Sequence, residues 1–384
     1  MQKLETVSMQ PARGYVGTAA GPADAPFRVK RASEAEFLEA DIYSTALKFI
    51  RGDIDIDGDV RAAIRYKLAH PGTRFRQLRT SALGALASLG VEHWFQTRRR
   101  AAQNITFHYD RSNDFYAAFL DRKMVYSCAY FARPDMTLDE AQAAKLDHIC
   151  RKLAVSAHDS FFDVGCGWGA MVMHAAREYG AQAAGCTVSP QQAGYGRAAI
   201  SKAGLDGMAR VDLCDYRDVQ GQFAKIASVG MFEHVGRKRL PAYFQTIYAM
   251  LERDGLFLNH GIVNAAGTKE GPQTRFLREY VFPGSELARL GDVIDAAEMA
   301  GFEVLDIENL RPHYALTCEH WARRLQQNRE RCLQFVTEEN WRIWLLYLAG
   351  CSISFEDGGM NLCQILLAKR GSRKRPLTRA YMYA

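Results

Sequence analysis

The chain has 384 residues, of which 48% are hydrophobic and 11% are aromatic, and it carries a net charge of +6. This composition can bury one large core or two smaller ones, so we expect a folded, soluble protein. No run of about 18 apolar residues occurs and the N-terminus lacks both a basic start and an apolar centre, which argues against a membrane span or signal peptide and predicts a cytoplasmic location. The nine cysteines are widely spaced without a CxxC pair, which predicts neither a disulfide framework nor a metal site.

The first hundred residues are predicted to form a tail and a small domain. Residues 1–26 are rich in Gly, Ala and Pro and have no periodic apolar positions, so we expect a disordered tail. Residues 27–100 are expected to form a mainly helical domain, with helices over 35–51 and 60–69 and an alternating strand between them that turns at Asp57-Gly58. The stretch GDIDIDGD imitates a calcium loop, but its twelfth position is Ile64 where Glu is required, so a calcium site is rejected.

A further helix is predicted over residues 74–98, where apolar residues recur at helical spacing beside several basic ones. Either this is an ordinary amphipathic helix, or it lies on an anionic lipid surface. In the second interpretation the residues at the membrane surface are Arg74, Arg76, Arg79, Arg98, Arg99 and Arg100.

Aromatic residues become dense from Asn104 onwards and include Phe107 and Tyr109. Such density is typical of a hydrophobic core, but its position upstream of a glycine-rich segment also suits a lid or a substrate wall. A helix over 137–153 follows, opened by a capping box between Thr137 and Glu140.

From residue 160 short apolar strands alternate with helices, which predicts an α/β fold with a doubly wound, mostly parallel, Rossmann-like sheet. At about residues 265–301 the alternation breaks, and we expect a helical cap insertion within a domain that spans 101–384. The expected strands are 160–165, 182–187, 209–214, 225–229, 256–260, 303–307 and 362–368. The expected helices are 170–179, 190–203, 239–251, 317–336 and 339–353.

The first of these strands ends in the segment DVGCGWG, which has Asp163 followed by Gly165, Gly167 and Gly169. A glycine turn between a strand and a helix directs backbone N–H groups at a ligand. The spacing is GxGxG, no acid ends the second strand and no Lys-Ser or Lys-Thr follows, so nicotinamide and P-loop sites are disfavoured and S-adenosylmethionine is the best candidate.

In this interpretation Asp163 lies near the sulfonium and amino group of the cofactor. Thr187 and Gln192 would replace the missing ribose-binding acid, and Tyr216 could stack on adenine. The alternative for Thr187 and Gln192 is a helix cap and a surface amide.

Seven segments, in this order and spacing, resemble the cyclopropane fatty acid synthase and mycolic acid cyclopropane synthase family: YSCAYF, DVGCGWG, TVSPQQ, CDYRD, SVGMFEHVG, FLNHGIV and PHYALT. The length and N-terminal extension look more like the bacterial phospholipid-modifying branch. The resemblance implies a class I methyltransferase that converts the cis double bond of a phospholipid acyl chain into a cyclopropane ring, through a carbocation deprotonated by bound bicarbonate. It also implies a homodimer associated peripherally with the inner face of the cytoplasmic membrane. Nucleic acid is disfavoured as a partner, because GMFEHVG stands where amino-methylating enzymes carry an NPPY-like turn.

The resemblance assigns residues to three groups. The bicarbonate-binding catalytic residues are Cys128, Glu233, His260, Ile262 and Tyr314, with Glu233 able to orient His260 and with Cys128 and Ile262 contributing backbone groups. The cofactor-binding residues are Tyr126, Ser127, Asp163, Gly165, Gly167, Trp168, Gly169, Thr187, Gln192, Asp215 and Tyr216. The substrate pocket would include Phe107, Tyr109 and Cys351.

The exact product stays open at this point. Relatives resembling this family form methylene-branched, methyl-branched or furan-precursor acyl chains, and this chain departs from the commoner pattern at Asn259-His260-Gly261 and at SFEDGGMNL. A lipid-binding protein without catalytic activity is a rival of another class, although the intact cofactor and base residues argue against it.

Overall fold

The structure is a computed structural model that describes residues 25–71, 112–267, 271–282, 286–373 and 377–383. The predicted helix over 74–98, its six arginines and the residues Phe107 and Tyr109 lie outside the described residues, as does nearly all of the predicted tail. Within the described ranges, no helix is long and apolar enough to span a membrane.

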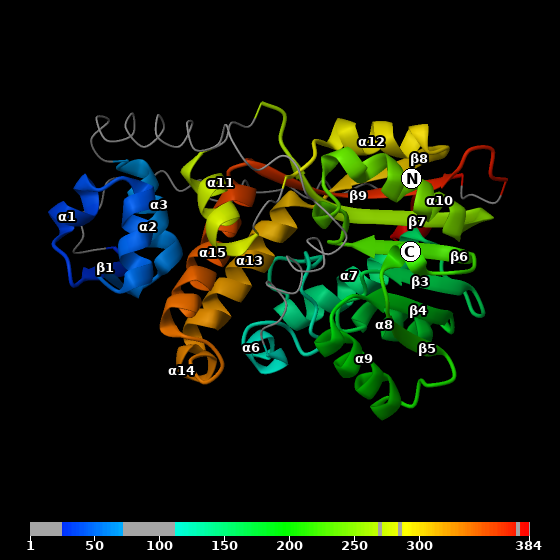
Figure 1. Ribbon diagram of the computed structural model, residues 1–384, viewed down its shortest axis with the longest axis horizontal. Coiled ribbons are helices and arrows are strands. Elements are labelled where there is room, and N and C mark those ends of the chain that lie inside the picture. The colour runs from blue at the N-terminus through cyan, green and yellow to red at the C-terminus, as the bar shows by residue number, and fades with distance from the viewer. Residues whose placement is uncertain (1–24, 72–111, 268–270, 283–285, 374–376, 384) are drawn as a thin grey trace, which may run out of the picture.

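A seven-stranded sheet with the order β5-β4-β3-β6-β7-β9-β8 forms the centre of the larger part of the molecule (Figure 1). The five strands from β5 to β7 run parallel, and β9 pairs antiparallel with both β7 and β8. This arrangement confirms the predicted fold class. The strands are β3 Ser160–Val164, β4 Gln182–Thr187, β5 Ala209–Leu213, β6 Phe223–Val229, β7 Leu251–Asn264, β8 Phe302–Asn309 and β9 Met360–Lys369.

Helices cover both faces of this sheet. On one face α7 Leu138–Lys152, α8 Ala170–Tyr179 and α9 Pro190–Lys202 contribute to one hydrophobic cluster. On the other face α10 Leu240–Met250 and α12 Leu290–Met299 contribute to another. The predicted capping box at the start of α7 is present.

The predicted cap insertion over about 265–301 is narrower than expected, because α12 packs on the sheet beside α10. Only α11 Pro272–Phe276 and the π-helix η5 Leu277–Val281 stand away from the sheet, where they contact helices α2 and α15. Helix α12 is the crossover helix between β7 and β8. Apolar periodicity in the sequence predicts a helix here but does not show whether that helix packs on the sheet or belongs to an insertion.

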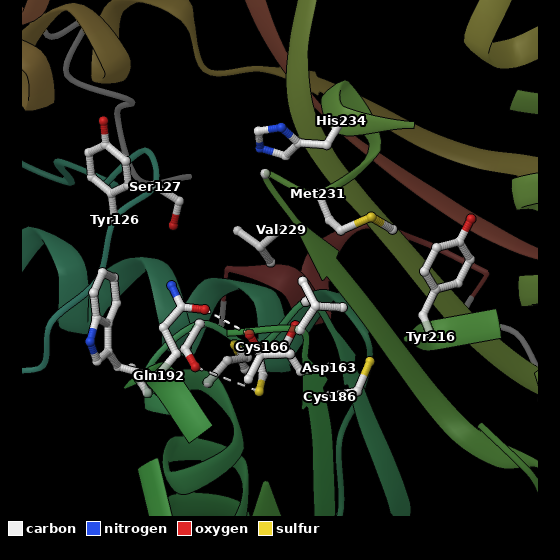
Figure 2. A pocket seen from close by; sticks show the side chains of 18 of the residues that line it. Tyr126, Ser127, Asp163, Cys166, Cys186, Gln192, Tyr216, Val229, Met231 and His234 are labelled. Atoms are coloured by element: carbon white, nitrogen blue, oxygen red, sulfur yellow. Dashed lines mark hydrogen bonds between the residues drawn. The ribbon is translucent and has the colours of Figure 1, made fainter. Parts of the chain in front are cut away.

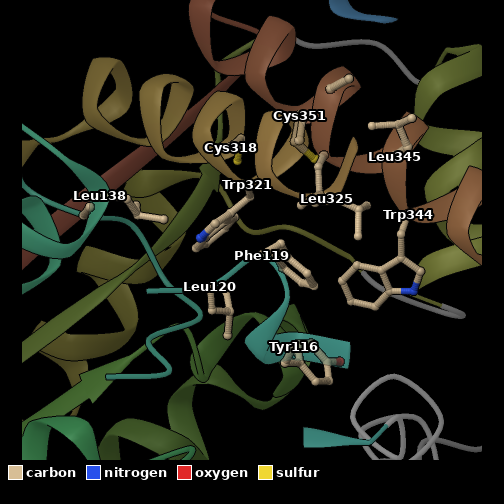
Figure 3. Packing of buried hydrophobic residues seen from close by; sticks show 14 of the residues in the cluster. Tyr116, Phe119, Leu120, Leu138, Cys318, Trp321, Leu325, Trp344, Leu345 and Cys351 are labelled. Atoms are coloured by element: carbon tan, nitrogen blue, oxygen red, sulfur yellow. The ribbon is translucent and has the colours of Figure 1, made fainter. Parts of the chain in front are cut away.

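Three further helices, with α6 Asn113–Ala117, surround an aromatic cluster beside the sheet (Figure 3). They are α13 Arg311–Gln327, α14 Arg329–Cys332 and α15 Glu338–Glu356. Helix α13 begins before the predicted residue 317, because Pro312 occupies its first turn, where a missing N–H costs nothing. Tyr314 therefore belongs to a helix and not to the loop before it.

The N-terminal segment forms a two-stranded antiparallel sheet and three helices. The strands are β1 Phe27–Lys30 and β2 Asp55–Gly58. The predicted helix over 35–51 is divided into α1 Glu34–Glu39 and α2 Ile42–Arg51, because Asp41 caps α2 by accepting from the backbone N–H of Ser44. Asp57 and Gly58 end β2 and lead directly into α3 Val60–Ala69, so they do not form a hairpin turn.

Arg342 on α15 connects this segment to the rest of the chain. Its side chain is buried, and Nη1 donates to the carbonyl oxygens of Phe49 and Ile54 at 3.1 and 3.4 Å. It also pairs with Asp55 at 3.2 Å and with Glu338 at 2.8 Å. Figure 1 shows the N-terminal helices in blue beside the orange helices α14 and α15, at the end of the molecule away from the sheet.

We expect Arg342→Leu to lower the free energy of unfolding by about 2–3 kcal/mol, because it leaves two carbonyl oxygens and a carboxylate without their buried donor. Urea unfolding measures the change, and limited proteolysis should show faster cleavage within residues 25–71. The exposed Arg323, which pairs with Glu319 on its own helix, provides the control: Arg323→Leu should cost less than about 0.5 kcal/mol. Equal losses in both variants would contradict the assigned role of Arg342.

Candidate functional site

One pocket opens at the carboxyl ends of β3, β4 and β6, where the connections after the adjacent strands β3 and β6 lead to helices on opposite faces of the sheet. Figure 2 shows Asp163 and Gln192 on one side of this pocket, with Tyr126 and Tyr216 at its two ends. The pocket collects ten of the eleven predicted cofactor-binding residues: Tyr126, Ser127, Asp163, Gly165, Gly167, Trp168, Thr187, Gln192, Asp215 and Tyr216. Gly169 does not line the pocket, since it serves as the N-terminal cap of α8.

The glycines of the loop are required by its backbone. Gly165, Gly167 and Gly169 have φ values of +79°, +54° and +86°, a left-handed conformation that residues with a Cβ rarely adopt. A Cβ on Gly165 would also lie 2.8 Å from Cγ of Met231. The loop can therefore turn sharply from β3 into α8, and its N–H groups and the positive end of the helix border the pocket.

Asp163 is the central acid of the pocket. It is 3% exposed, and its Oδ1 has no hydrogen-bond partner among the described residues. Burial raises the pKa of Asp163 to about 7, against an opposing effect of the positive charge on Lys145. A buried carboxylate oxygen without a donor is costly, so this position favours a ligand that brings a cation or an N–H group.

Lys145 on α7 lines the same pocket, and the sequence analysis missed it. It is 2% exposed and donates to Oγ of Ser127 at 2.9 Å, and burial lowers its pKa to about 8. A signal was available in the sequence. Gln142 and Lys145 occupy the same helical stripe as Leu138 and Ile149, and polar residues at core-facing positions are unusual enough to suggest a site.

Side chains from α7 and α13 hold the segment that contains Ser127 and Cys128. Nε2 of Gln142 donates to the carbonyl oxygen of Ser127 at 2.8 Å, and Oγ1 of Thr317 accepts from the N–H of Ala129 at 3.0 Å. Cys128 is fully buried between these anchors, and burial raises the pKa of its thiol far above the usual range. A neutral thiol without access to solvent is a structural group, not a nucleophile.

Thr187, the last residue of β4, and Gln192, on α9, are not the helix cap and the surface amide considered as the alternative. Ser189 caps α9 by accepting from the backbone N–H of Gln192, and the Gln192 side chain is 6% exposed. Oγ1 of Thr187 lies 2.7 Å from Oε1 of Gln192, which fixes the direction of the amide beside the pocket. At the other end, Asp215 caps η2 Tyr216–Asp218 and pairs with Arg217, whose Nε donates to it at 2.7 Å.

Trp168, predicted to bind the cofactor, forms part of the wall of the pocket. Its Nε1 donates to Oδ1 of Asn113 at 2.8 Å, and its ring lies 5.0 Å from that of Tyr116. Tyr126 also borders the pocket and lies 5.0 Å from the ring of Trp321. Both residues therefore join the pocket to the aromatic cluster shown in Figure 3.

Glu233 lies just beyond β6, in the single turn η3 Phe232–His234. Its Oε1 accepts from the backbone N–H of Ile262 at 2.8 Å, while Oε2 is buried without a partner among the described residues. Burial raises the pKa of Glu233 to about 7. The expectation that Glu233 orients His260 is wrong, because this carboxylate binds the backbone of Ile262 instead. The N–H of Ile262 is therefore already occupied by Glu233.

His260 on β7 is fully buried, and its Nδ1 lies 3.1 Å from Nε2 of Gln364. Its Nε2 has no partner in the described part of the chain, and burial lowers the pKa of the ring well below its ordinary value. Tyr314 stacks on Phe355 with ring centroids 4.5 Å apart. Burial raises the pKa of Tyr314, and the charges of Cys318, Tyr126, Cys128 and Glu233 add to the increase.

One sequence departure, at Gly261, gains a physical explanation from this geometry. A Cβ on Gly261 would lie 2.1 Å from Cε1 of Phe232 and 2.9 Å from Cδ of Glu233. Glycine at this position thus lets the η3 turn pack directly against β7. Cys351, predicted as a pocket residue, is 6% exposed and lies in the aromatic cluster with Cys128.

The chain was compared with known proteins and structures. A family model described as mycolic acid cyclopropane synthetase matches residues 96–365. A probable fatty acid methyltransferase of Pseudomonas putida is 41% identical over 343 residues, which cover 87% of this chain and 85% of that protein. Sphingolipid C9-methyltransferase A of Emericella nidulans is 32% identical over 335 residues, 84% of this chain and 64% of that protein. A crystal structure of mycolic acid cyclopropane synthase CmaA1 complexed with SAH and CTAB aligns with a TM-score of 0.67 at 34% identity, covering 70% of this chain and 98% of that one.

The raised pKa of Asp163 predicts a pH dependence of stability. Its folded-state pKa of about 7 lies above the ordinary value of 3.8, so the folded state retains the proton between these values. The free energy of unfolding should therefore fall as pH rises through this window, by about 1.4 kcal/mol for each pKa unit. Asp163→Asn should remove this contribution and be more stable than the parent protein at pH 8.

Urea unfolding at pH 5 and pH 8 measures the effect of Asp163→Asn. The same substitution at the exposed Asp135, which pairs with Arg133, should leave the pH profile of the parent protein unchanged. If the free energy of unfolding changes by the same amount between pH 5 and pH 8 in the parent protein and in Asp163→Asn, Asp163 is not a buried, destabilised carboxylate.

Proposed function

The chain belongs to the mycolic acid cyclopropane synthetase family, and on this premise we propose that it adds a carbon from S-adenosylmethionine to the cis double bond of an unsaturated acyl chain and closes a cyclopropane ring. The observation that carries the proposal is a pair of buried carboxyl groups, Asp163 and Glu233. Each has one oxygen without a partner among the described residues and a pKa of about 7.

The residues of the pocket fit S-adenosylmethionine. The unpartnered Oδ1 of Asp163 suits a donor that carries an ammonium and a sulfonium charge. The N–H groups of the glycine loop, the amide of Gln192 and the ring of Tyr216 can hold the remaining polar and aromatic parts. When bound, S-adenosylmethionine supplies the methyl group, and the similar synthase CmaA1 is described as complexed with SAH.

A second set of groups fits a small oxyanion, for which bicarbonate is the candidate. His260 is neutral because burial disfavours its charged form, so one of its nitrogens can donate a hydrogen bond. Tyr314, whose raised pKa keeps the hydroxyl protonated, is a second donor. Glu233 can accept an O–H at Oε2. When bound, bicarbonate supplies the base for the last proton.

The aromatic cluster beside the pocket supplies what an alkene acceptor requires. An alkene is a weak nucleophile, so it must be held against the methyl group and kept away from water. Tyr126 and Trp168 border both the pocket and the cluster, and rings in the cluster include those of Tyr116, Trp321 and Trp344. These residues exclude water and present aromatic faces, which favour a developing positive charge.

The lipid carrier and the cellular setting extend the proposal. We assign a membrane phospholipid as the carrier of the acyl chain and a peripheral position on the membrane, with the arginines of residues 74–100 at the lipid surface. This assignment is supported by the clustering of these arginines in the sequence, since each basic side chain near an anionic surface adds about 1 kcal/mol of attraction.

A second product class uses the same site. The similar proteins from Pseudomonas putida and Emericella nidulans carry the names fatty acid methyltransferase and sphingolipid C9-methyltransferase, not cyclopropane synthase. If the proton leaves a neighbouring carbon of the acyl chain, the result is a methyl branch beside a retained double bond. If a hydride first shifts from the methylated carbon to the cation, loss of a proton from the transferred methyl group gives a methylene branch. These names favour that outcome as the alternative.

Variants of the base site test the proposal. Glu233→Gln and Tyr314→Phe should lower turnover of S-adenosylmethionine with unsaturated phospholipid vesicles by about 10²-fold or more, because each removes a group that binds the base. Binding of S-adenosylhomocysteine, measured by calorimetry, should stay unchanged.

The matched controls for these variants are Glu298→Gln, at an exposed position of α12, and Tyr248→Phe, beside Phe302. Both should retain full turnover. Full activity in Glu233→Gln and Tyr314→Phe would overturn the base site, whereas loss of S-adenosylhomocysteine binding would show that these residues serve the cofactor pocket instead.

A further inference from the structure

Three polar side chains lie in one row across the last three strands of the sheet. In the strand register, His260 on β7 is opposite Gln364 on β9, and Gln364 is opposite Glu308 on β8. Residues directly opposite one another share a face of the sheet, so the three side chains are neighbours. His260 and Gln364 are 0% exposed, and Nε2 of Gln364 lies 3.1 Å from Nδ1 of His260.

Helix α7 covers this row with charged groups. Glu308 pairs with His148 at 2.8 Å and with Lys152 at 2.5 Å. The pKa of His260 is lowered first by burial and then by the charges of Lys145, Lys152 and His148, while Glu308 alone raises it. His260 is therefore neutral near pH 7 and carries a single ring proton.

The partner of Nδ1 decides where that proton lies. The nitrogen end of the Gln364 amide faces Nδ1 of His260, while Oε1 of Gln364 has no partner among the described residues. An amide nitrogen only donates hydrogen bonds, so in this orientation Nδ1 of His260 is the acceptor. The ring proton is then on Nε2, which is turned away from β9 and has no partner among the described residues. Gln364 cannot leave this position easily, because β9 is paired on both sides and its side chain is fully buried.

We propose that Gln364 is a positioning residue that fixes His260 as the Nε2–H tautomer and so presents a hydrogen-bond donor to an oxyanion. The identity of that oxyanion rests on the function proposed above, whereas the tautomer itself does not. In the opposite tautomer, Nε2 would be an acceptor and would repel a bound carboxylate or bicarbonate oxygen. Gln364 thus performs the orienting role that the sequence analysis assigned to Glu233.

The tautomer can be measured directly by long-range ¹H–¹⁵N NMR on the full chain labelled at histidine, with His260 assigned from the spectrum of His260→Gln. We expect protonated Nε2 and unprotonated Nδ1 in the parent protein. Gln364→Met removes the donor at nearly constant volume and should give a mixture of tautomers. Gln364→Glu offers only acceptor oxygens and should place a proton on Nδ1, which provides a second readout if Gln364→Met does not fold.

Turnover provides the functional readout. Gln364→Met should lower turnover about 10–100-fold, as loss of a group that orients a ligand-binding histidine typically does, and should leave the affinity for S-adenosylhomocysteine unchanged. The control is Asn361→Met on the same strand, where Asn361 accepts from Nδ2 of Asn309 at 3.3 Å and does not contact His260. Asn361→Met should retain the parent tautomer and turnover.

A proton on Nδ1 in the parent protein, or an unchanged tautomer in both Gln364 variants, would overturn the proposal whatever the activity. Absence of methyl transfer to lipid with the expected tautomer changes would instead count only against the proposed function. The expected tautomers together with full turnover in Gln364→Met would show that the orientation of His260 is not needed for the reaction, and would overturn the positioning role.

Discussion

The site depends on polar atoms that stay unpaired in an apolar interior, at the carboxyl ends of the parallel strands. Asp163, Glu233 and His260 each have a buried atom without a partner among the described residues. Each such atom costs free energy that the packing of the surrounding clusters must offset. The carboxyl ends of β3 and β6 and the nearby part of β7 bring these atoms to the same region, and a ligand that pairs with them recovers what folding leaves unsatisfied.

Much of the fold follows from local sequence patterns. The alternation of apolar strands and helices predicts β3, β4 and α8 with nearly the observed bounds, because the spacing of apolar residues along the sequence distinguishes strands from helices. The glycine loop is equally predictable from the sequence, since its positive φ values disfavour residues with a Cβ. The split between α1 and α2 was missed because it depends on a single capping residue, Asp41, within an otherwise helical pattern.

The parts that could not be predicted depend on contacts between distant elements. Gln364 is ordinary in sequence, and its meaning comes only from the register that sets it opposite His260. Lys145 acquires its lowered pKa from burial in the folded interior, against the opposing charges of Asp121 and Asp163. The resemblance to known synthases named Glu233 and Tyr314 without their geometry, and the structure then corrected the partner of Glu233 from His260 to the backbone of Ile262.

We propose that carbon from S-adenosylmethionine closes a ring across an acyl double bond. The most direct measurement uses S-adenosylmethionine with a fully deuterated methyl group, unsaturated phospholipid vesicles and mass spectrometry of the product. Ring closure should give a lipid that gains one carbon, loses one of the transferred deuterium atoms and no longer reacts with ozone, because the double bond has become a cyclopropane. A labelled lipid that still reacts with ozone would identify a branched product and contradict ring closure, and the absence of any labelled lipid would contradict the account as a whole.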